Sequence, residues 1–304
     1  MSTLLTDDLP RGLEGLSQDQ LFQLREIVHK KAWFRASTIE PFTPTEKKAL
    51  TDALKNGGEA AQKRVRDRIY RHHHWDSLRW FLFGGLVDIP NLPENPHYAY
   101  DPETNPWIKV RVPGWAKTLD EHDEANPYKV LPDKDYLRLY AYAWVYEPLV
   151  LVPKSRQMMV TWLFCCIAAH NLGVRPAQRM AIISKKFEDA DALLERTEIV
   201  CDQLPRDRFY APKVLKKSGE ISCAATDSVA MAMGEEAKGL RQYTFSWVFS
   251  DEMAFQDQAD GMMQAAMPTV KGGGRLTGVS TANGEEVFHA ALSENGKIPT
   301  PAGS

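Results

Sequence analysis

From about residue 131 onward, the sequence alternates short apolar segments with segments of helical length, and this alternation limits the possible folds more than any other feature. The apolar segments are nearly free of charge and are bounded by proline, glycine or polar residues, as strands buried on both faces of a parallel sheet are. The predicted strands are 149–152, 180–184, 221–225, 229–233, 244–250 and 275–280, and the predicted helices are 161–172, 187–204 and 259–267. We therefore predict an α/β fold with a mainly parallel sheet flanked by helices.

The first 130 residues have a different pattern. Apolar residues at helical spacing predict helices over 17–36 and 59–83, the second closed by Gly84 and Gly85. Residues 88–135 are rich in Pro, Asn and Asp and show little periodicity, so we interpret them as a long irregular connection. The sequence thus predicts a largely helical N-terminal region over 1–130, followed by a core over 131–304.

Composition argues against several classes of protein. The chain of 304 residues has a net charge of −3, so charge alone gives no sign of a nucleic-acid partner. The longest apolar run near the middle, 162–169, is too short to cross a bilayer, and the N-terminus lacks the pattern of a signal peptide. The four cysteines form no C-x-x-C pair and are predicted to be reduced and packed. We expect neither a membrane protein nor a secreted one.

Three clusters are given structural interpretations. The basic runs at 63–66 and 213–217 are interpreted as solvated helix or loop faces. His72, His73 and His74 fall within a predicted helix. Consecutive helical residues point in different directions, so we do not expect these three to share a metal ion.

The segment 149–164, LVLVPKSRQMMVTWLF, has the layout of a phosphate-binding loop between a buried strand and a helix. When the usual G-x-x-x-x-G-K-[ST] pattern is aligned on Thr161, Lys154 stands at the first glycine, Met159 at the second and Val160 at the lysine. Only the hydroxyl is retained, and the alternative is an ordinary strand–turn–helix. Lys154 and Arg156 would nevertheless supply cations for phosphate oxygens, and Thr161 is placed for Mg²⁺.

A second segment, TFSWVFSDEMAF over 244–255, is an apolar strand that ends in Asp251 and Glu252. A carboxylate at the end of such a strand holds the Mg²⁺ shell, and its neighbour polarises water for attack on a γ-phosphate. The strand tip turns adjacent side chains in different directions, which suits this division of roles. The acidic pair follows the loop with strand–helix units between them, and this order strengthens both signals.

These segments together resemble the large terminase subunit of tailed phages. KSRQMMVTW at 154–162 is similar to that family's variant phosphate loop, and AIISKKFEDADAL at 181–193 to the strand and helix that follow. GLRQYTFSWVFSDEMAF at 239–255 resembles the family's acidic strand, and GVSTAN at 278–283 its coupling motif. The resemblance covers about 131–290 and implies a P-loop NTPase fold of the ASCE or RecA-like type.

The resemblance also implies roles for matching residues. ATP and Mg²⁺ would be the cofactors, with Thr161 and Asp251 at the metal and Glu252 as the catalytic carboxylate. The residues implied in ATP binding are Lys154, Ser155, Arg156, Gln157, Val160, Thr161 and Tyr136, and those implied in coupling are Ser280, Thr281 and Asn283. Arg241 stands where some relatives place an arginine finger that acts on a neighbouring subunit, and Arg156 is the alternative, acting in cis. Leu137 stands where an adenine-reading glutamine is usual, which leaves stacking on Tyr136 as the substitute.

We expect from this resemblance an ATPase that drives double-stranded DNA into a viral procapsid, in the host cytoplasm at the portal. Portal protein, the small terminase subunit and further copies of the chain in a ring would be its partners. We expect no DNA cleavage, because the chain stops soon after the coupling motif, where the family's nuclease domain would begin. The alternatives are a nucleotide-binding scaffold without hydrolysis and a helicase-like translocase. The segment after Asn283 lacks the second RecA-like domain that the translocase needs.

Overall fold

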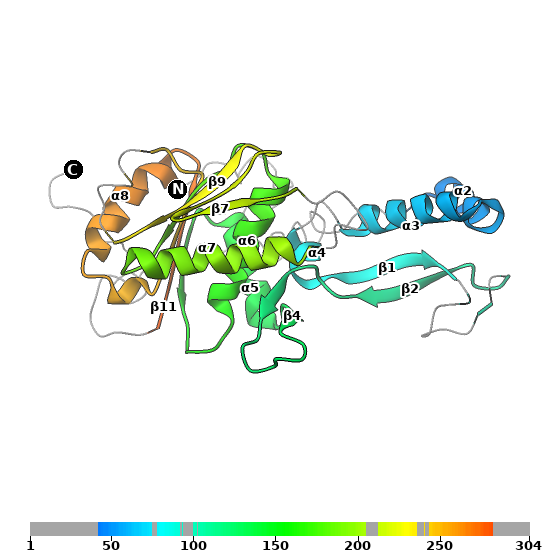
Figure 1. The fold of residues 1–304 in the computed structure, drawn as a ribbon, viewed down its shortest axis with the longest axis horizontal. Helices are drawn as coiled ribbons and strands as arrows, with labels where there is room; N and C mark the ends of the chain where they lie inside the picture. The colour runs from blue at the N-terminus through cyan, green and yellow to red at the C-terminus, as the bar shows by residue number, and fades with distance from the viewer. Residues whose placement is uncertain are drawn as a thin grey trace, which may run out of the picture. The chain divides into compact units, whose positions relative to one another are not determined.

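The chain is described here by a computed structural model, shown in Figure 1. It divides into two compact units, Met1–Ile39 and Glu40–Ser304. The structure describes residues within 42–281, with gaps at 75–77, 92, 94–99, 102, 205–211, 236–239 and 241–242. The predicted helix over 17–36 lies outside these residues, and the proposed boundary near residue 130 stays a proposal.

A seven-stranded sheet forms the centre of the second unit, with strand order β5-β11-β10-β6-β9-β8-β7. The first five strands in this order are parallel, and β8 and β7 extend the sheet in antiparallel fashion. The bounds are β5 Leu149–Pro153, β6 Arg179–Ile183, β7 Leu215–Lys217, β8 Glu220–Cys223, β9 Ser228–Met233, β10 Trp247–Asp251 and β11 Arg275–Ser280. The predicted mainly parallel α/β sheet is confirmed.

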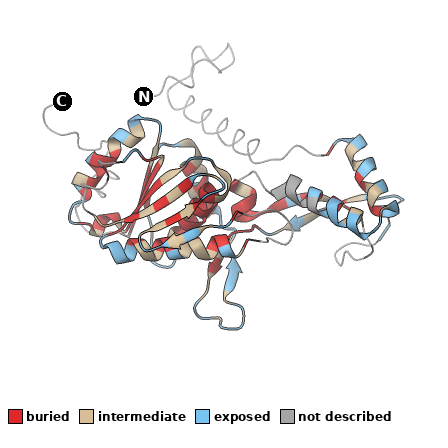
Figure 2. Cartoon of the chain, turned by 45° about the horizontal axis from the view of Figure 1, so that its top comes forward, coloured by how far each residue is buried: buried red, intermediate tan, exposed pale blue. Residues whose placement is uncertain are grey.

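Two layers of helices cover the sheet, and alternate residues of β10 point into different layers, as the two-residue period of a strand requires. Trp247 and Phe249 pack against Phe164 of α6 (Val160–Val174), and Trp247 also meets Trp144 of α5 (Asp135–Tyr146). Val248 packs into a different cluster with α8 (Ala259–Lys271). A fourth helix, α7 (Phe187–Asp202), lies against α6, β6 and β9. Figure 2 shows buried residues concentrated on the strands and on helices beside them.

The helix α6 is buried over almost its whole length, because it combines an apolar sequence with positions next to α5, α7 and the sheet. Gly173 lies inside this helix, which ends at Val174 and not at Leu172 as predicted. Its contacts fix the start of the helix, at Val160, relative to the strand edges. That placement matters because the predicted phosphate loop leads directly into it.

The helix α5 is held to the sheet by Arg275 of β11. The guanidinium donates hydrogen bonds to the carbonyls of Trp144 at 2.6 Å, Val145 at 2.8 Å and Glu147 at 3.1 Å. These carbonyls lie at the C-terminal end of the helix, where intrahelical donors are missing, so a cation there satisfies them. Arg275 thereby links the end of α5 to β11, the strand next to β5 in the sheet.

The region before residue 131 differs from the sequence-based prediction. The predicted helix 59–83 consists of α3 (Glu59–His74) and α4 (Leu78–Phe83), and α2 (Pro44–Asn56) precedes them. Gly84 follows α4 with φ of 62° and closes it, as predicted. A Cβ at Gly84 would meet the carbonyl of Val112, so glycine is also needed for this close approach.

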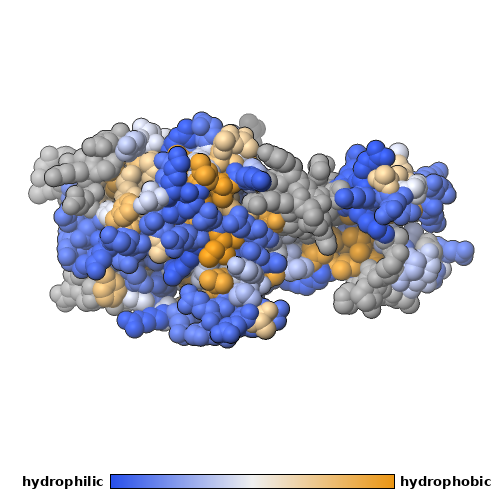
Figure 3. Space-filling model, viewed as in Figure 1, coloured by the Kyte–Doolittle hydropathy of each residue, from blue (hydrophilic) through white to orange (hydrophobic). Residues whose placement is uncertain are grey.

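The predicted irregular connection over 88–135 is wrong in part, because three short strands and the end of a fourth lie within it. β1 (Gly85–Pro90) pairs antiparallel with β2 (Trp107–Val112), and β3 (Lys117–Leu119) with β4 (Tyr128–Val130). The partners are separated by long segments rich in polar and turn residues, which hides the pairing in the sequence. On the face shown in Figure 3, hydrophilic residues dominate and hydrophobic ones form small scattered areas. No helix among the described residues is long and apolar enough to span a membrane.

Candidate active site

The loop between β5 and α6 turns sharply without glycine. Gln157 and Met159 have φ values of 63° and 57°, in the left-handed region that side chains with a Cβ rarely adopt. Met159 is the residue that precedes the first helical turn of α6, and it stands where the usual pattern has its second glycine. The loop therefore keeps a left-handed backbone at this position although the glycine is absent.

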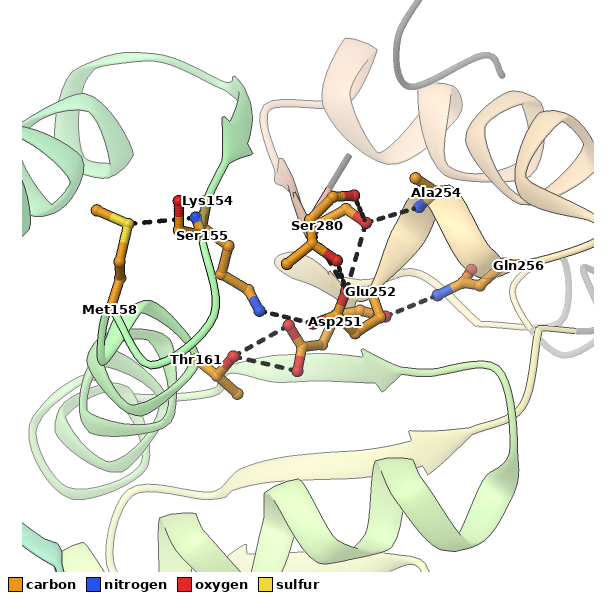
Figure 4. A network of polar contacts seen from close by, with 10 residues as sticks. Lys154, Ser155, Met158, Thr161, Asp251, Glu252, Ala254, Gln256 and Ser280 are labelled. Carbon is orange, nitrogen blue, oxygen red and sulfur yellow. Dashed lines mark hydrogen bonds and ion pairs between the residues drawn. The ribbon is translucent and has the colours of Figure 1, made fainter. Parts of the chain in front are cut away.

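Lys154 begins the loop and points toward the acidic pair. Its backbone N–H donates to the carbonyl of Ser280 at 2.9 Å, which joins the loop to the end of β11. Its side chain is only 9% exposed, and Nζ donates to Oε1 of Glu252 at 2.6 Å. Figure 4 shows the lysine reaching from the loop toward the carboxylates. The predicted inward reach of Lys154 is thus present.

Thr161 lies in the first turn of α6 and faces Asp251 at the end of β10. Its hydroxyl is 3.1 Å and 3.2 Å from the two carboxylate oxygens of Asp251. Burial raises the pKa of Asp251 to about 6, and the neighbouring Glu252 charge adds to the effect while Lys154 and Thr161 oppose it. A buried carboxylate of this kind is stabilised by a nearby cation.

Glu252 turns away from Asp251, because its backbone is left-handed with φ of 49°. Besides Lys154, its carboxylate receives hydrogen bonds from the backbone N–H of Thr281 at 3.3 Å and from the Thr281 hydroxyl at 3.2 Å. Burial opposes ionisation, but these hydrogen bonds outweigh it and hold the pKa of Glu252 below its ordinary value. The adjacent carboxylates therefore have opposite pKa shifts and face different partners (Figure 4).

The strand order explains how distant segments meet. β11 lies between β5, which leads into the loop, and β10, which carries the acidic pair. Ser280 and Thr281 at the end of β11 consequently lie between the loop and Glu252. The Ser280 hydroxyl accepts a hydrogen bond from the backbone N–H of Ala254 at 3.1 Å and lies 3.5 Å from Oε2 of Glu252. The carboxyl ends of parallel strands are where ligands bind in open α/β sheets.

Gln256 supports the acidic strand end and was missed by the sequence analysis. Its buried amide donates to the hydroxyl of Ser250 at 2.9 Å and to the backbone carbonyl of Asp251 at 3.0 Å. No pattern in the sequence indicated this role, because the contact depends on the three-residue helix (Met253–Phe255) that turns the chain back after Glu252.

The other predicted site residues are placed as follows. Ser155, Arg156 and Gln157 are exposed on the loop, whereas the side chain of Val160 is buried, so a role for Val160 in binding would use its backbone. Tyr136 lies in α5 and packs against Tyr140, with ring centroids 6.3 Å apart. Arg241 and Asn283 lie outside the described residues.

Two side chains at the site could together contact a metal ion. Among the described residues no group of three or more His, Cys, Asp and Glu side chains could hold a metal ion. Thr161 and Asp251 offer one hydroxyl and one carboxylate, and Mg²⁺ is commonly bound by one or two carboxylates together with waters and phosphate oxygens. The donor set therefore suits a magnesium nucleotide.

Comparisons with known proteins find a resemblance in structure only. No protein-family model and no curated protein matches the sequence. A mutant ATPase domain of the Thermus phage P74-26 large terminase is similar at 16% identity and a TM-score of 0.43, covering 52% of this chain and 69% of that one. The HK97 bacteriophage large terminase is similar at 13% identity and a TM-score of 0.44, covering 55% of this chain and 38% of that one.

A third similar structure is the large terminase of a thermophilic bacteriophage in complex with ADP, with 11% identity, a TM-score of 0.40, and coverage of 49% of this chain and 39% of that one. The matched region thus spans well under half of these two terminase chains. All three similar proteins are of the family that the sequence resembles.

Proposed function

We propose that this chain is the ATP-hydrolysing motor domain of a viral terminase large subunit, which drives double-stranded DNA into a procapsid. The proposal is carried by one observation: four side chains meet at the carboxyl ends of the parallel strands. They form two hydrogen-bonded pairs, Lys154–Glu252 and Thr161–Asp251, with distances of 2.6–3.2 Å. This combination of a cation, a hydroxyl and two carboxylates is what phosphoryl transfer from a nucleoside triphosphate requires.

Each residue has a distinct role in this proposal. Thr161 and Asp251 would hold Mg²⁺, which would supply positive charge against the phosphate oxygens when bound. Lys154 places its ammonium against the γ-phosphate, and Glu252 orients the attacking water and accepts its proton. Ser280 and Thr281 contact Glu252 and are placed to sense the γ-phosphate.

The Lys154–Glu252 ion pair gives this mechanism a resting state. Both groups are needed for hydrolysis, yet in the structure each neutralises the other at 2.6 Å. A triphosphate in the loop competes for Lys154, and Glu252 is then free to take a water. The pairing links activation of the carboxylate to the arrival of nucleotide.

Phosphate release measured with wild-type protein and Glu252→Gln tests the proposal. We expect the wild type to hydrolyse ATP in the presence of Mg²⁺ and the variant to lose about 10²–10⁴-fold in kcat, the usual contribution of a general base. ATP binding should persist in the variant, because glutamine does not compete for Lys154 by charge. Asp257→Asn is the matched control, since Asp257 is an exposed carboxylate five positions away whose side chain pairs with Lys185 at 3.3 Å.

Two outcomes would change the assignment. ATP binding without turnover in the wild type would favour a nucleotide-binding scaffold, for which the glycine-free loop and the Lys154–Glu252 pair are the supporting observations. Equal turnover in the wild type and Glu252→Gln would show that Glu252 is not the catalytic carboxylate.

The remaining parts of the proposal concern partners. We propose that the chain acts on double-stranded DNA at the procapsid portal in the host cytoplasm, with portal protein and small terminase subunit. A homo-oligomeric ring would let an arginine finger act between subunits, with Arg241 as the candidate in trans and Arg156 in cis. Asn283 would complete the coupling motif. A helicase-like translocase is the alternative within the same fold.

A further inference from the structure

A pocket of about 460 Å³ lies beside the first turn of α6. Its apolar wall comes from the hairpin of β3 and β4 and from the start of the helix, through Leu119, Val130, Pro132, Met159 and Trp162. The volume falls in the range of roughly 300–1,000 Å³ that is typical of small-molecule sites. The mechanism described above uses none of these side chains.

The pocket is next to the phosphate loop. Met159 is the last residue of the loop, and Trp162 follows Thr161, whose hydroxyl contacts Asp251. The same helical turn therefore presents one residue to the metal site and two to the pocket. A molecule bound by its phosphates at the loop has its other end within reach of this wall.

The charges around the pocket orient such a molecule. Asp120 and Glu121 lie on the lining, and Lys129 is engaged by Asp120 at 3.1 Å and by Asp123 at 2.7 Å. Carboxylates repel a triphosphate and accept hydrogen bonds from an amino group. The phosphates are thereby directed toward Lys154, and the uncharged end of the molecule toward the hairpin.

Trp162 supplies a flat surface whose position is fixed from α7. The guanidinium of Arg196 lies 5.7 Å from the centre of a Trp162 ring, an arrangement that stabilises the ring. Bases stack on aromatic side chains, and apolar groups such as proline and leucine complete a slot for a planar ring. Purines stack over a larger area than pyrimidines.

We propose that this pocket binds the purine base of the nucleoside triphosphate whose phosphates the loop holds, an inference that rests on the proposed function. Tyr136, the residue implicated in adenine stacking by the sequence, is not among the residues that line the pocket. The base is held instead by Trp162 and the β3–β4 hairpin, and its exocyclic amine faces the acidic side.

Equilibrium titration with Mg²⁺-ATP and with inorganic tripolyphosphate separates base binding from phosphate binding. We expect Trp162→Ala to weaken ATP binding about 10-fold, equivalent to about 1.4 kcal/mol, with tripolyphosphate affinity unchanged. Trp162→Phe should keep most of the ATP affinity, because it retains an aromatic face. Val130→Trp, a change at a residue that is 36% exposed, should fill the pocket and weaken ATP selectively without disturbing the core.

Tyr128→Ala is the matched control, since Tyr128 lies in β4 of the same hairpin, is 45% exposed and does not line the pocket. It should bind both ligands as the wild type does. Unchanged ATP affinity in Trp162→Ala and Val130→Trp would overturn the base pocket, as would equal weakening of both ligands. A wild type that binds neither ATP nor tripolyphosphate would overturn the proposed function itself, and the pocket assignment with it.

Discussion

Asp251 is a buried carboxylate whose environment disfavours its ionised form. It is 8% exposed, and burial raises its pKa to about 6, above the ordinary value of 3.8. At low pH the Asp251 carboxyl is protonated in both the folded and the unfolded protein, and its raised pKa costs no stability. As the pH rises from about 4 through 6, the free energy of unfolding falls, because the unfolded chain ionises more readily. Above pH 6 the folded, nucleotide-free protein holds an ionised group that the unfolded chain solvates better.

We predict that Asp251→Asn raises the free energy of unfolding of the nucleotide-free protein at pH 7.5 by up to about 3 kcal/mol. The gain should shrink to about 1 kcal/mol near pH 4.5 and approach zero below about pH 3, and Mg²⁺-dependent hydrolysis should be lost at every pH. Chemical denaturation at both pH values, without Mg²⁺, measures the effect, and Asp257→Asn should show no such gain. A destabilised Asp251→Asn protein at pH 7.5 would show that the ionised carboxylate contributes to the free fold.

The residues of the site were largely predictable because each one ends or begins an element of recognisable pattern. Asp251 and Glu252 follow an apolar strand, and Lys154 and Thr161 flank a polar loop before an apolar helix. Parallel topology then brings strand ends together. Gln256 was missed, and so was Trp162 of the proposed base pocket, since their contacts depend on a local turn and on a hairpin from another part of the chain.

The loop between β5 and α6, which is the predicted phosphate loop, turns sharply through two residues that are not glycine. Gln157 and Met159 hold left-handed conformations that cost roughly 1–2 kcal/mol for a residue with a Cβ. The buried helix α6 fixes one end of the loop, and the hydrogen bond between Lys154 and Ser280 fixes the other. Together they hold the loop in its left-handed conformation. The strain is thus imposed by the flanking elements.

We predict that Gln157→Gly stabilises the protein by about 0.5–1 kcal/mol, because relief of the left-handed conformation exceeds the added entropy of the unfolded chain. Gln157 is exposed, so little packing is lost. Gln157→Ala serves as the control, since alanine has the same backbone penalty as glutamine. Thermal unfolding of the three proteins measures the difference, and equal gains from glycine and alanine would refute the strain explanation.

The strands of the central sheet were predictable from the sequence, whereas the antiparallel pair β1–β2 was not. The strands of the core were identified because burial on both faces leaves short apolar runs, such as 247–249 at the start of β10. The strands Gly85–Pro90 and Trp107–Val112 were overlooked, although the second alternates apolar and charged residues. Antiparallel pairing across a long intervening segment is fixed by tertiary contact, which composition does not reveal.

At the scale of the whole molecule, a finger acting in trans would need several copies of the chain. If Arg241 is that finger, it acts on the ATP of a neighbouring subunit, whereas Glu252 acts on the ATP of its own. Isolated chains should then hydrolyse slowly and assembled rings quickly, since a trans arginine stabilises charge that develops in the transition state.

We predict that Arg241→Ala and Glu252→Gln proteins, each inactive alone in the assembled ring, regain part of the phosphate-release activity when mixed. A mixed interface combines an intact arginine from one subunit with an intact carboxylate from the other. Arg156→Ala is the comparison. If Arg156 acts in cis, every site in a mixture of Arg156→Ala and Glu252→Gln lacks one of the two groups, and no activity should return. An absence of rescue in a ring of confirmed assembly would place the finger elsewhere.

The central claim is that the four side chains at the sheet edge surround a magnesium nucleotide, and a high-resolution structure with Mg²⁺ and a non-hydrolysable ATP analogue tests it most directly. The quantity to measure is the distance from Nζ of Lys154 to Glu252, which is 2.6 Å in the free protein. The account predicts that this ion pair opens and that Nζ lies about 3 Å from a phosphate oxygen, with Mg²⁺ beside Thr161 and Asp251. A nucleotide bound elsewhere, or one bound while the Lys154–Glu252 pair stays closed, would contradict it.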